Sequence, residues 1–222
     1  MESHTPQSLR DSSPNLGEQL RTAPLIGVIR HRLATDGQGV TTLVAFHGCP
    51  LQCKYCLNNQ CHSPKGIVRT ITPKDLVDEL AIDNLYFLAT GGGVCFGGGE
   101  PLLYSEFISE FCALKVPEWK VTLETSLNVA RHHLERVLPH IDQYYIDIKD
   151  INPEIYHDYT KCDNPQMLDN LRWLLSHDGL ADRIIVRLPL IPEYNTLQDR
   201  DHSKKLLAEM GVVHFDEFEY TI

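Results

Sequence analysis

The chain has 222 residues and a mass of 25.2 kDa, a length that suits one α/β domain, and 42% of its residues are apolar, which is enough for a sizeable core. Its formal net charge of -10 and pI near 5.5 give no overall basic field, which argues against a nucleic-acid partner bound through phosphates. No stretch approaches a membrane span and the polar N-terminus lacks the apolar core of a secretory signal, so we expect a cytoplasmic protein with no membrane partner.

The N-terminal third predicts a tail, a short strand, a turn and a main strand. Residues 1–23 are rich in Ser, Pro, Thr and Gln without an apolar period, so we expect a flexible tail ahead of one domain over residues 24–222. The apolar run 25–29 predicts a short strand, and Asp36-Gly37-Gln38-Gly39 predicts a turn because glycine reaches positive φ without steric cost. The β-branched and apolar run 41–46 predicts the first main strand, with a cysteine-rich loop after it.

Helical and strand patterns alternate through the rest of the chain. Apolar positions three and four apart predict helices within residues 73–81, 107–114, 129–138, 167–175 and 206–210. Apolar or β-branched runs predict strands at residues 94–96, 119–124, 144–149, 184–191 and 215–222. This alternation implies parallel strands in right-handed crossovers. Six βα units are too few to close the eight-stranded barrel, so the expected α/β fold is an open, partial (βα)6 TIM-like barrel.

Sites in such sheets lie at the carboxyl ends of the strands. Five groups of residues fall at or just past the predicted strand ends, one group per strand: Cys49, Gly98-Gly99-Glu100, Glu124, Asp147 with Lys149, and Arg187. Their agreement predicts one shared site at this edge of the sheet.

Three of the seven cysteines, Cys49, Cys53 and Cys56, form a C-x3-C-x2-C pattern. Thiolates this close can converge on one inorganic centre, and soft sulfur ligands select zinc, copper(I) or an iron-sulfur cluster. A cubane cluster normally takes four cysteines, so three would leave one iron free to bind a small molecule. The alternative is a zinc-bound interaction module in which Cys61 or His62 supplies the fourth ligand.

The other strand-end residues each allow two interpretations. The segment 97–100 can offer glycine carbonyls and its glutamate to a bound ammonium, although a plain glycine-rich turn has the same composition. Asp147 and Lys149 lie two apart on a strand and therefore point to one face, as ligand contacts or as a strand-end ion pair. Arg187 interrupts an apolar strand and either pairs with a carboxylate such as Glu124 or meets a ligand.

The cysteine pattern, with Tyr55 before its last cysteine and Gly98-Gly99-Glu100 further along, resembles the signature of the radical S-adenosylmethionine (SAM) superfamily. Together with Asp36-Gly37-Gln38-Gly39 and the segment 147–152, it resembles the glycyl-radical-enzyme activating enzymes, with the pyruvate formate-lyase activating enzyme as nearest type, over roughly residues 25–205. This resemblance implies a [4Fe-4S] cluster that cleaves SAM reductively to a 5′-deoxyadenosyl radical. It also implies a glycyl radical enzyme as protein substrate and reduced flavodoxin or ferredoxin as electron donor.

The resemblance also implies roles for individual residues. The three motif cysteines would hold the cluster, and the expected contacts with SAM are Tyr55, Cys56, Leu57, Gly98, Gly99, Glu100, Glu124, Asp147, Ile148, Lys149, Arg187 and His202. His202 enters this set because a proline ten positions before a histidine, here Pro192, resembles the family pattern; alone it would be read as a surface residue. The chain departs from the family in lacking a ferredoxin-like cysteine insertion between Cys56 and Gly91, so one cluster is expected. The alternative within enzymes is a radical SAM enzyme that modifies a peptide or a small metabolite.

Overall fold

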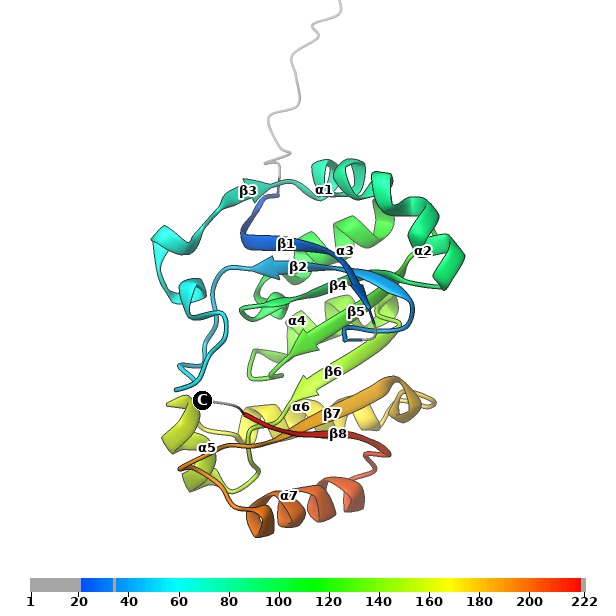
Figure 1. The fold of residues 1–222 in the computed structure, drawn as a ribbon. Helices are drawn as coiled ribbons and strands as arrows, with labels where there is room; N and C mark the ends of the chain where they lie inside the picture. Colours follow the sequence, from blue (N-terminus) through cyan, green and yellow to red (C-terminus); the bar gives the residue numbers. More distant parts are fainter. Residues whose placement is uncertain (1–20, 34, 221–222) are drawn as a thin grey trace, which may run out of the picture.

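An eight-stranded sheet runs through the computed structural model, which describes residues 21–33 and 35–220 (Figure 1). The predicted tail over residues 1–23 lies outside the described residues as far as residue 20, and the first strand begins at Ala23. Among the helices that the structure describes, none combines the length and the apolar character needed to cross a membrane.

The strands follow one another in chain order as β1 (Ala23–Leu33), β2 (Val40–Phe46), β3 (Arg69–Ile71), β4 (Gly93–Gly98), β5 (Lys120–Thr125), β6 (Gln143–Asp147), β7 (Ile184–Leu190) and β8 (His214–Glu219). Their order across the sheet is β3-β1-β2-β4-β5-β6-β7-β8. All neighbours from β2 to β8 pair in parallel, whereas β1 pairs antiparallel with β2 and with β3. The six parallel strands confirm the predicted partial barrel, and β1 and β3 add an antiparallel edge to it.

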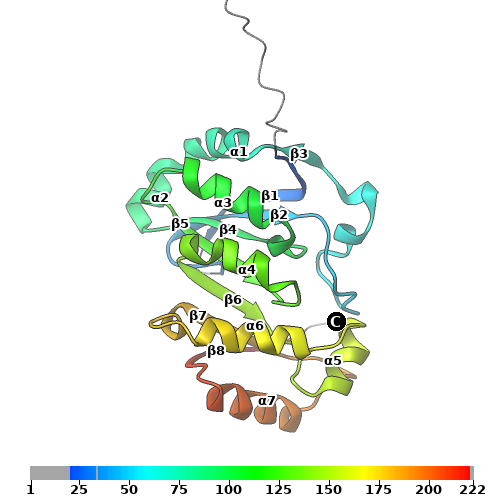
Figure 2. The same ribbon diagram turned by 180° about the vertical axis from the view of Figure 1, so that it is seen from behind.

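Seven α-helices connect the strands of the described chain: α1 (Pro73–Leu80), α2 (Asn84–Thr90), α3 (Ser105–Leu114), α4 (Arg131–Val137), α5 (Pro153–Thr160), α6 (Pro165–Leu175) and α7 (Leu197–Glu209). Figure 2 shows α3, α4 and α6 packed across one face of the sheet. The Thr72 side chain accepts a hydrogen bond from the backbone N–H of Asp75 and so caps the N-terminus of α1. Helix α5 was not predicted because its eight residues bury only Tyr156, Tyr159 and Thr160, too few for a clear apolar period.

The core lies between the strands and the helices on the face shown in Figure 2. Phe96 of β4 lies at its centre, with its ring centroid 5.6 Å from that of Phe46 in β2 and 5.2 Å from that of Phe111 in α3. All three rings are fully buried. This packing fixes β2 and β4 side by side, and the loops that leave their carboxyl ends therefore lie together.

A buried carboxylate joins β1 to the start of α2. Asp83 accepts hydrogen bonds from both Nε and Nη2 of Arg30, and its Oδ1 lies 2.8 Å from Nε2 of His31. Burial raises the pKa of Asp83, but the hydrogen bonds from Arg30 and His31 outweigh this effect and hold the pKa below its ordinary value.

This ion pair makes the stability of the fold dependent on pH. Because the pKa of Asp83 is lower in the folded state, its contribution is complete above the unfolded-state pKa of about 4 and is lost as the pH falls through the folded-state pKa. Urea unfolding between neutral and acidic pH should therefore show a smaller acid-induced loss in Asp83→Asn than in the wild type, from a lower starting stability. Parallel stability profiles for the two proteins would contradict this assignment.

Candidate functional site

A cavity of about 990 Å³ lies along the inner face of the curved sheet. Gln143, Tyr145 and Asp147 line it from β6, because alternate residues of a strand point to the same side. The structure brings nearly all of the predicted site residues to this cavity wall: Cys49, Cys53, Tyr55, Cys56, Leu57, Gly98, Gly99, Glu100, Glu124, Asp147, Lys149 and Arg187. The residues at and just past the ends of the parallel strands therefore share one cavity wall, as the rule for such sheets predicts.

The loop after β2 carries the three motif cysteines. Backbone hydrogen bonds from Gln52 N to Thr160 O, 2.8 Å, and from Lys54 N to Tyr159 O, 3.3 Å, hold this loop against α5. All three cysteines are half-buried free thiols on the cavity wall. Three soft donors that face one cavity suit an iron-sulfur cluster.

Burial makes two of these thiols hard to ionise on their own. It raises the pKa of Cys49 far above its ordinary value and the pKa of Cys53 to about 11. Lys149 opposes the shift at Cys53 because its positive charge favours the thiolate. Cysteines bind metals as thiolates. A cationic centre bound here would therefore supply the positive charge that stabilises the deprotonated form of these buried thiols.

The glycine segment at the end of β4 packs directly on the cysteine loop. Gly99 N donates to Phe46 O at 2.9 Å, and Glu100 N donates to Gly48 O at 2.7 Å. A Cβ atom on Gly99 would lie 2.2 Å from Gly48 O, so glycine is required for this close approach. The segment therefore positions the cysteine loop in addition to lining the cavity.

Glu100 is fully buried and bonded within the protein. Its Oε1 accepts from Thr125 Oγ1 at 2.6 Å, and its Oε2 accepts from Ser126 N at 2.9 Å and from Ser126 Oγ at 2.7 Å. Leu102 N donates to the same carboxylate at 3.2 Å. Burial raises the pKa of Glu100, and these hydrogen bonds oppose the rise. The side chain thus joins the ends of β4 and β5, and a contact with a ligand ammonium remains a prediction.

Asp147 and Lys149 lie side by side at the end of β6, as their spacing predicts. Nζ of Lys149 is 3.7 Å from Oδ1 of Asp147 and 3.0 Å from the Tyr220 hydroxyl. Burial lowers the pKa of Lys149, but Asp147, Tyr220 and Cys53 more than offset this and raise it above its ordinary value. The cavity wall therefore keeps a positive ammonium close to the motif cysteines.

Arg187 pairs with Glu124, as the first of its two interpretations predicts, and its contact with a ligand remains a prediction. The Nη1–Oε1 distance is 2.9 Å, and Nη2 also donates to Thr35 O at 2.9 Å. The guanidinium carbon lies 4.3 Å from the centroid of the Tyr145 ring. These contacts compensate for the burial of the charge.

Two predicted contacts do not line the cavity. Ile148 is fully buried in the core, and His202 is exposed on α7. Tyr55 and Leu57 do line it, and the Tyr55 hydroxyl donates to Glu193 at 3.1 Å. His202, which was selected by its spacing from Pro192, therefore does not lie on the cavity wall.

Several cavity residues were not predicted individually. Asp36 is fully buried and accepts from Arg32, and both residues line the cavity. Its turn was predicted, and an aspartate before two glycines was an available signal. Tyr220, which lies just after β8, carried no signal at all, because its role depends on the distant Lys149.

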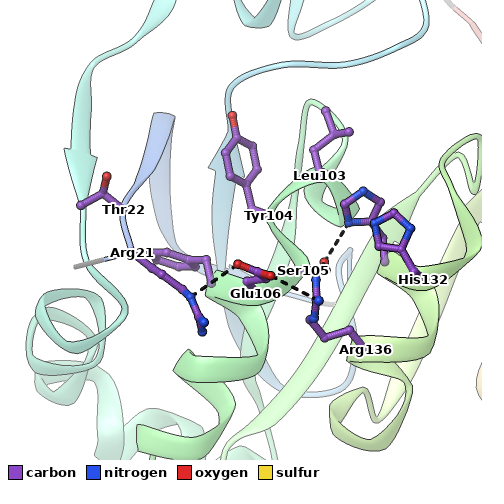
Figure 3. Close-up of a pocket in the computed structure, with 10 residues that line it drawn as sticks. Arg21, Thr22, Leu103, Tyr104, Ser105, Glu106, His132 and Arg136 are labelled. Carbon is purple, nitrogen blue, oxygen red and sulfur yellow. Dashed lines mark hydrogen bonds and ion pairs between the residues drawn. The ribbon is translucent and has the colours of Figure 1, made fainter. Parts of the chain in front are cut away.

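A second cavity, of about 320 Å³, lies between the start of the described chain and helices α3 and α4 (Figure 3). Glu106 lies between Arg21 and Arg136, at 3.5 Å and 3.2 Å respectively. Ser105 Oγ lies 2.9 Å from Nδ1 of His133. Because these groups pair with one another, we interpret the cavity as a structural contact.

The family model described as the radical SAM superfamily matches residues 43–207, which include the cysteine loop and the ends of β4 to β7. The chain belongs to the radical SAM superfamily. Radical SAM proteins use a [4Fe-4S] cluster and SAM, and the three thiols on one cavity wall fit such a cluster.

Relatives in this superfamily include named activating enzymes. The chain is 36% identical over 163 residues to the (2S)-3-sulfopropanediol dehydratase activating enzyme of Klebsiella oxytoca, which covers 71% of this chain and 49% of the relative. It is 30% identical over 203 residues to pyruvate formate-lyase 2-activating enzyme of Escherichia coli K12, covering 78% and 68% of the two chains. The chain thus spans about half the length of the first relative.

Solved structures of the superfamily share the fold. Streptococcus suis SuiB bound to SAM superposes with a TM-score of 0.58 and 13% sequence identity, over 81% of this chain and 42% of SuiB. At this identity the likeness supports the architecture alone.

Proposed function

We propose that Cys49, Cys53 and Cys56 hold one [4Fe-4S] cluster, and that the protein cleaves SAM reductively to place a glycyl radical on a partner enzyme. The observation that carries the proposal is the single cavity that contains these thiols, the glycine segment and the Asp147–Lys149 pair. The two activating enzymes among the relatives support the choice of partner.

Cys49, Cys53 and Cys56 would hold the cluster, which would pass one electron from an external reduced donor to SAM; cleavage to methionine and an adenosyl radical would supply the group that takes a hydrogen atom from the target glycine. The residues of the chain bind SAM and orient it. Gly98 and Gly99 let the ligand approach the backbone, and Lys149 offers a buried ammonium to a carboxylate. Glu100 positions the glycine segment through its bonds to Thr125 and Ser126.

The proposed cluster needs all three motif cysteines. Substitution of one of them should therefore abolish SAM cleavage. After anaerobic reconstitution with iron and sulfide, the wild type with SAM and dithionite should form 5′-deoxyadenosine. Cys53→Ala should form none above background because the cluster loses a ligand. Cys112→Ala, a half-buried thiol on α3, is the matched control and should equal the wild type. Product would be measured by liquid chromatography.

The partner is tested in the same reaction. Addition of a candidate glycyl radical enzyme should produce a glycyl radical doublet in the electron paramagnetic resonance spectrum. Nucleoside formed without that signal, but with a mass change on a peptide, would favour peptide modification. A colourless protein that contains zinc after anaerobic purification would favour the zinc-bound interaction module, and product from Cys53→Ala would overturn the ligand set.

A further inference from the structure

A second group of metal-ligand side chains lies beside the cysteine loop. The ligand atoms of Cys56, Cys61 and His62 all lie within 4.8 Å of one another. Within residues 21–33 and 35–220, no other group of three or more Cys, His, Asp or Glu ligands meets this spacing. The group includes only one of the three motif cysteines, so its spacing is that of a site for a single ion, which shares Cys56 with the cluster site.

The backbone holds these ligands in place. Cys61 and His62 belong to the short 3-10 helix η1 (Asn59–His62). Cys61 N donates to Asn58 O at 2.8 Å, and Cys61 O accepts from Gly48 N at 2.9 Å. Cys61 is 1% exposed, packed with Ile26, Leu43, Ala45 and Cys95, so its thiol has little freedom. A bound ion would therefore order few additional groups.

The donor set has a clear chemical preference. Two thiolates and one imidazole are the soft and borderline ligands that bind zinc. Cys56 is half-buried and His62 is exposed, so an ion here would face solvent on one side. Three protein ligands leave a fourth position for water, which suits an exchangeable ion.

We propose that Cys56, Cys61 and His62 form a mononuclear site for a divalent transition metal, with zinc as the expected ion, in the protein that lacks its cluster. Cys56 belongs to both ligand sets, so occupation of this site and of the cluster site would exclude each other. This exclusion rests on the proposed function, whereas the mononuclear site itself does not.

The site is tested with the full chain after reduction and removal of metals under anaerobic conditions. Titration with Co²⁺ should give about one equivalent of binding, with thiolate-to-cobalt charge-transfer bands and tetrahedral d–d bands that zinc abolishes. Cys61→Ser and His62→Ala should each weaken binding by more than about tenfold, since even partners outside the ligand set contribute that much to metal affinity. Cys112→Ala should bind like the wild type.

The two ligand sets are separated by comparing variants. Cys53→Ala should lose the cluster and keep the cobalt spectrum, Cys61→Ser should keep the cluster and lose that spectrum, and Cys56→Ser should lose both. Zinc added before reconstitution should block cluster formation in the wild type and not in Cys61→Ser.

Wild-type cobalt affinity and spectrum in Cys61→Ser would overturn the proposal. If Cys61→Ser does not fold, the same test is made with His62→Ala, which should fold because the His62 side chain is exposed. Absence of 5′-deoxyadenosine would count against the proposed function alone, because cobalt binding is measured without SAM or cluster.

Discussion

Replacement of Glu100 by alanine is expected to lower the free energy of unfolding by about 3 kcal/mol, the upper end of the cost of leaving buried donors without an acceptor. The carboxylate receives hydrogen bonds from Thr125, from the N–H and hydroxyl of Ser126, and from Leu102 N. Without it, these buried donors would have no partner, and the ends of β4 and β5 would lose their connection. Urea unfolding monitored by circular dichroism measures the loss.

The matched control for this prediction is Glu118→Ala. Glu118 is exposed, and its removal should change stability by no more than about 0.5 kcal/mol. Glu100→Gln keeps the shape but turns an amide N–H₂ toward groups that donate, so it should fall between the two alanine variants. Equal stability of Glu100→Ala and Glu118→Ala would show that the hydrogen bonds at Glu100 add nothing to the fold.

Gly99→Ala is expected to destabilise the protein by about 1–3 kcal/mol, the range for overpacking, and to weaken SAM binding. The added Cβ would lie 2.2 Å from Gly48 O and 2.9 Å from Phe46 O. Both carbonyls accept hydrogen bonds from the glycine segment, so they cannot move away without breaking the contact between the two loops. Urea unfolding reports the strain, and isothermal titration calorimetry of the reconstituted protein reports SAM affinity.

Gly27→Ala provides the comparison for the Gly99 variant. Gly27 lies in β1, and a Cβ there would meet no atom within 4 Å. It should be as stable as the wild type or slightly more so, because alanine loses less backbone entropy than glycine on folding. If both alanine variants unfold at the same urea concentration and bind SAM equally, the close approach at Gly99 has no energetic importance.

The sequence predicted most elements of the fold because their signals are local. The strands that became β2 and β5 to β8 and the helices that became α1, α3, α4, α6 and α7 all carry apolar periods or β-branched runs within a few residues. The strand that became β3 was not predicted because three residues are too short for a period. Its pairing with β1 is a contact between segments far apart in the chain.

The candidate site divides in the same way. The cysteine pattern and the residues at strand ends were visible because parallel strands place their carboxyl ends at one edge, wherever the helices between them lie. The pairing of Arg187 with Glu124 could not be established from the sequence, since Glu124 lies 63 positions away. The same limit applied to His202, whose helix presents it to solvent.

The sequence by itself therefore determined the class of fold, the order of most of its elements and the loop that carries the thiols. The tertiary structure alone decided that Glu100 bonds to Ser126, that Lys149 meets Tyr220, and that Cys61 lies beside Cys56. The physical reason is that periodicity is a property of neighbouring residues, whereas the partner of a buried polar group is set by the packing of the whole chain.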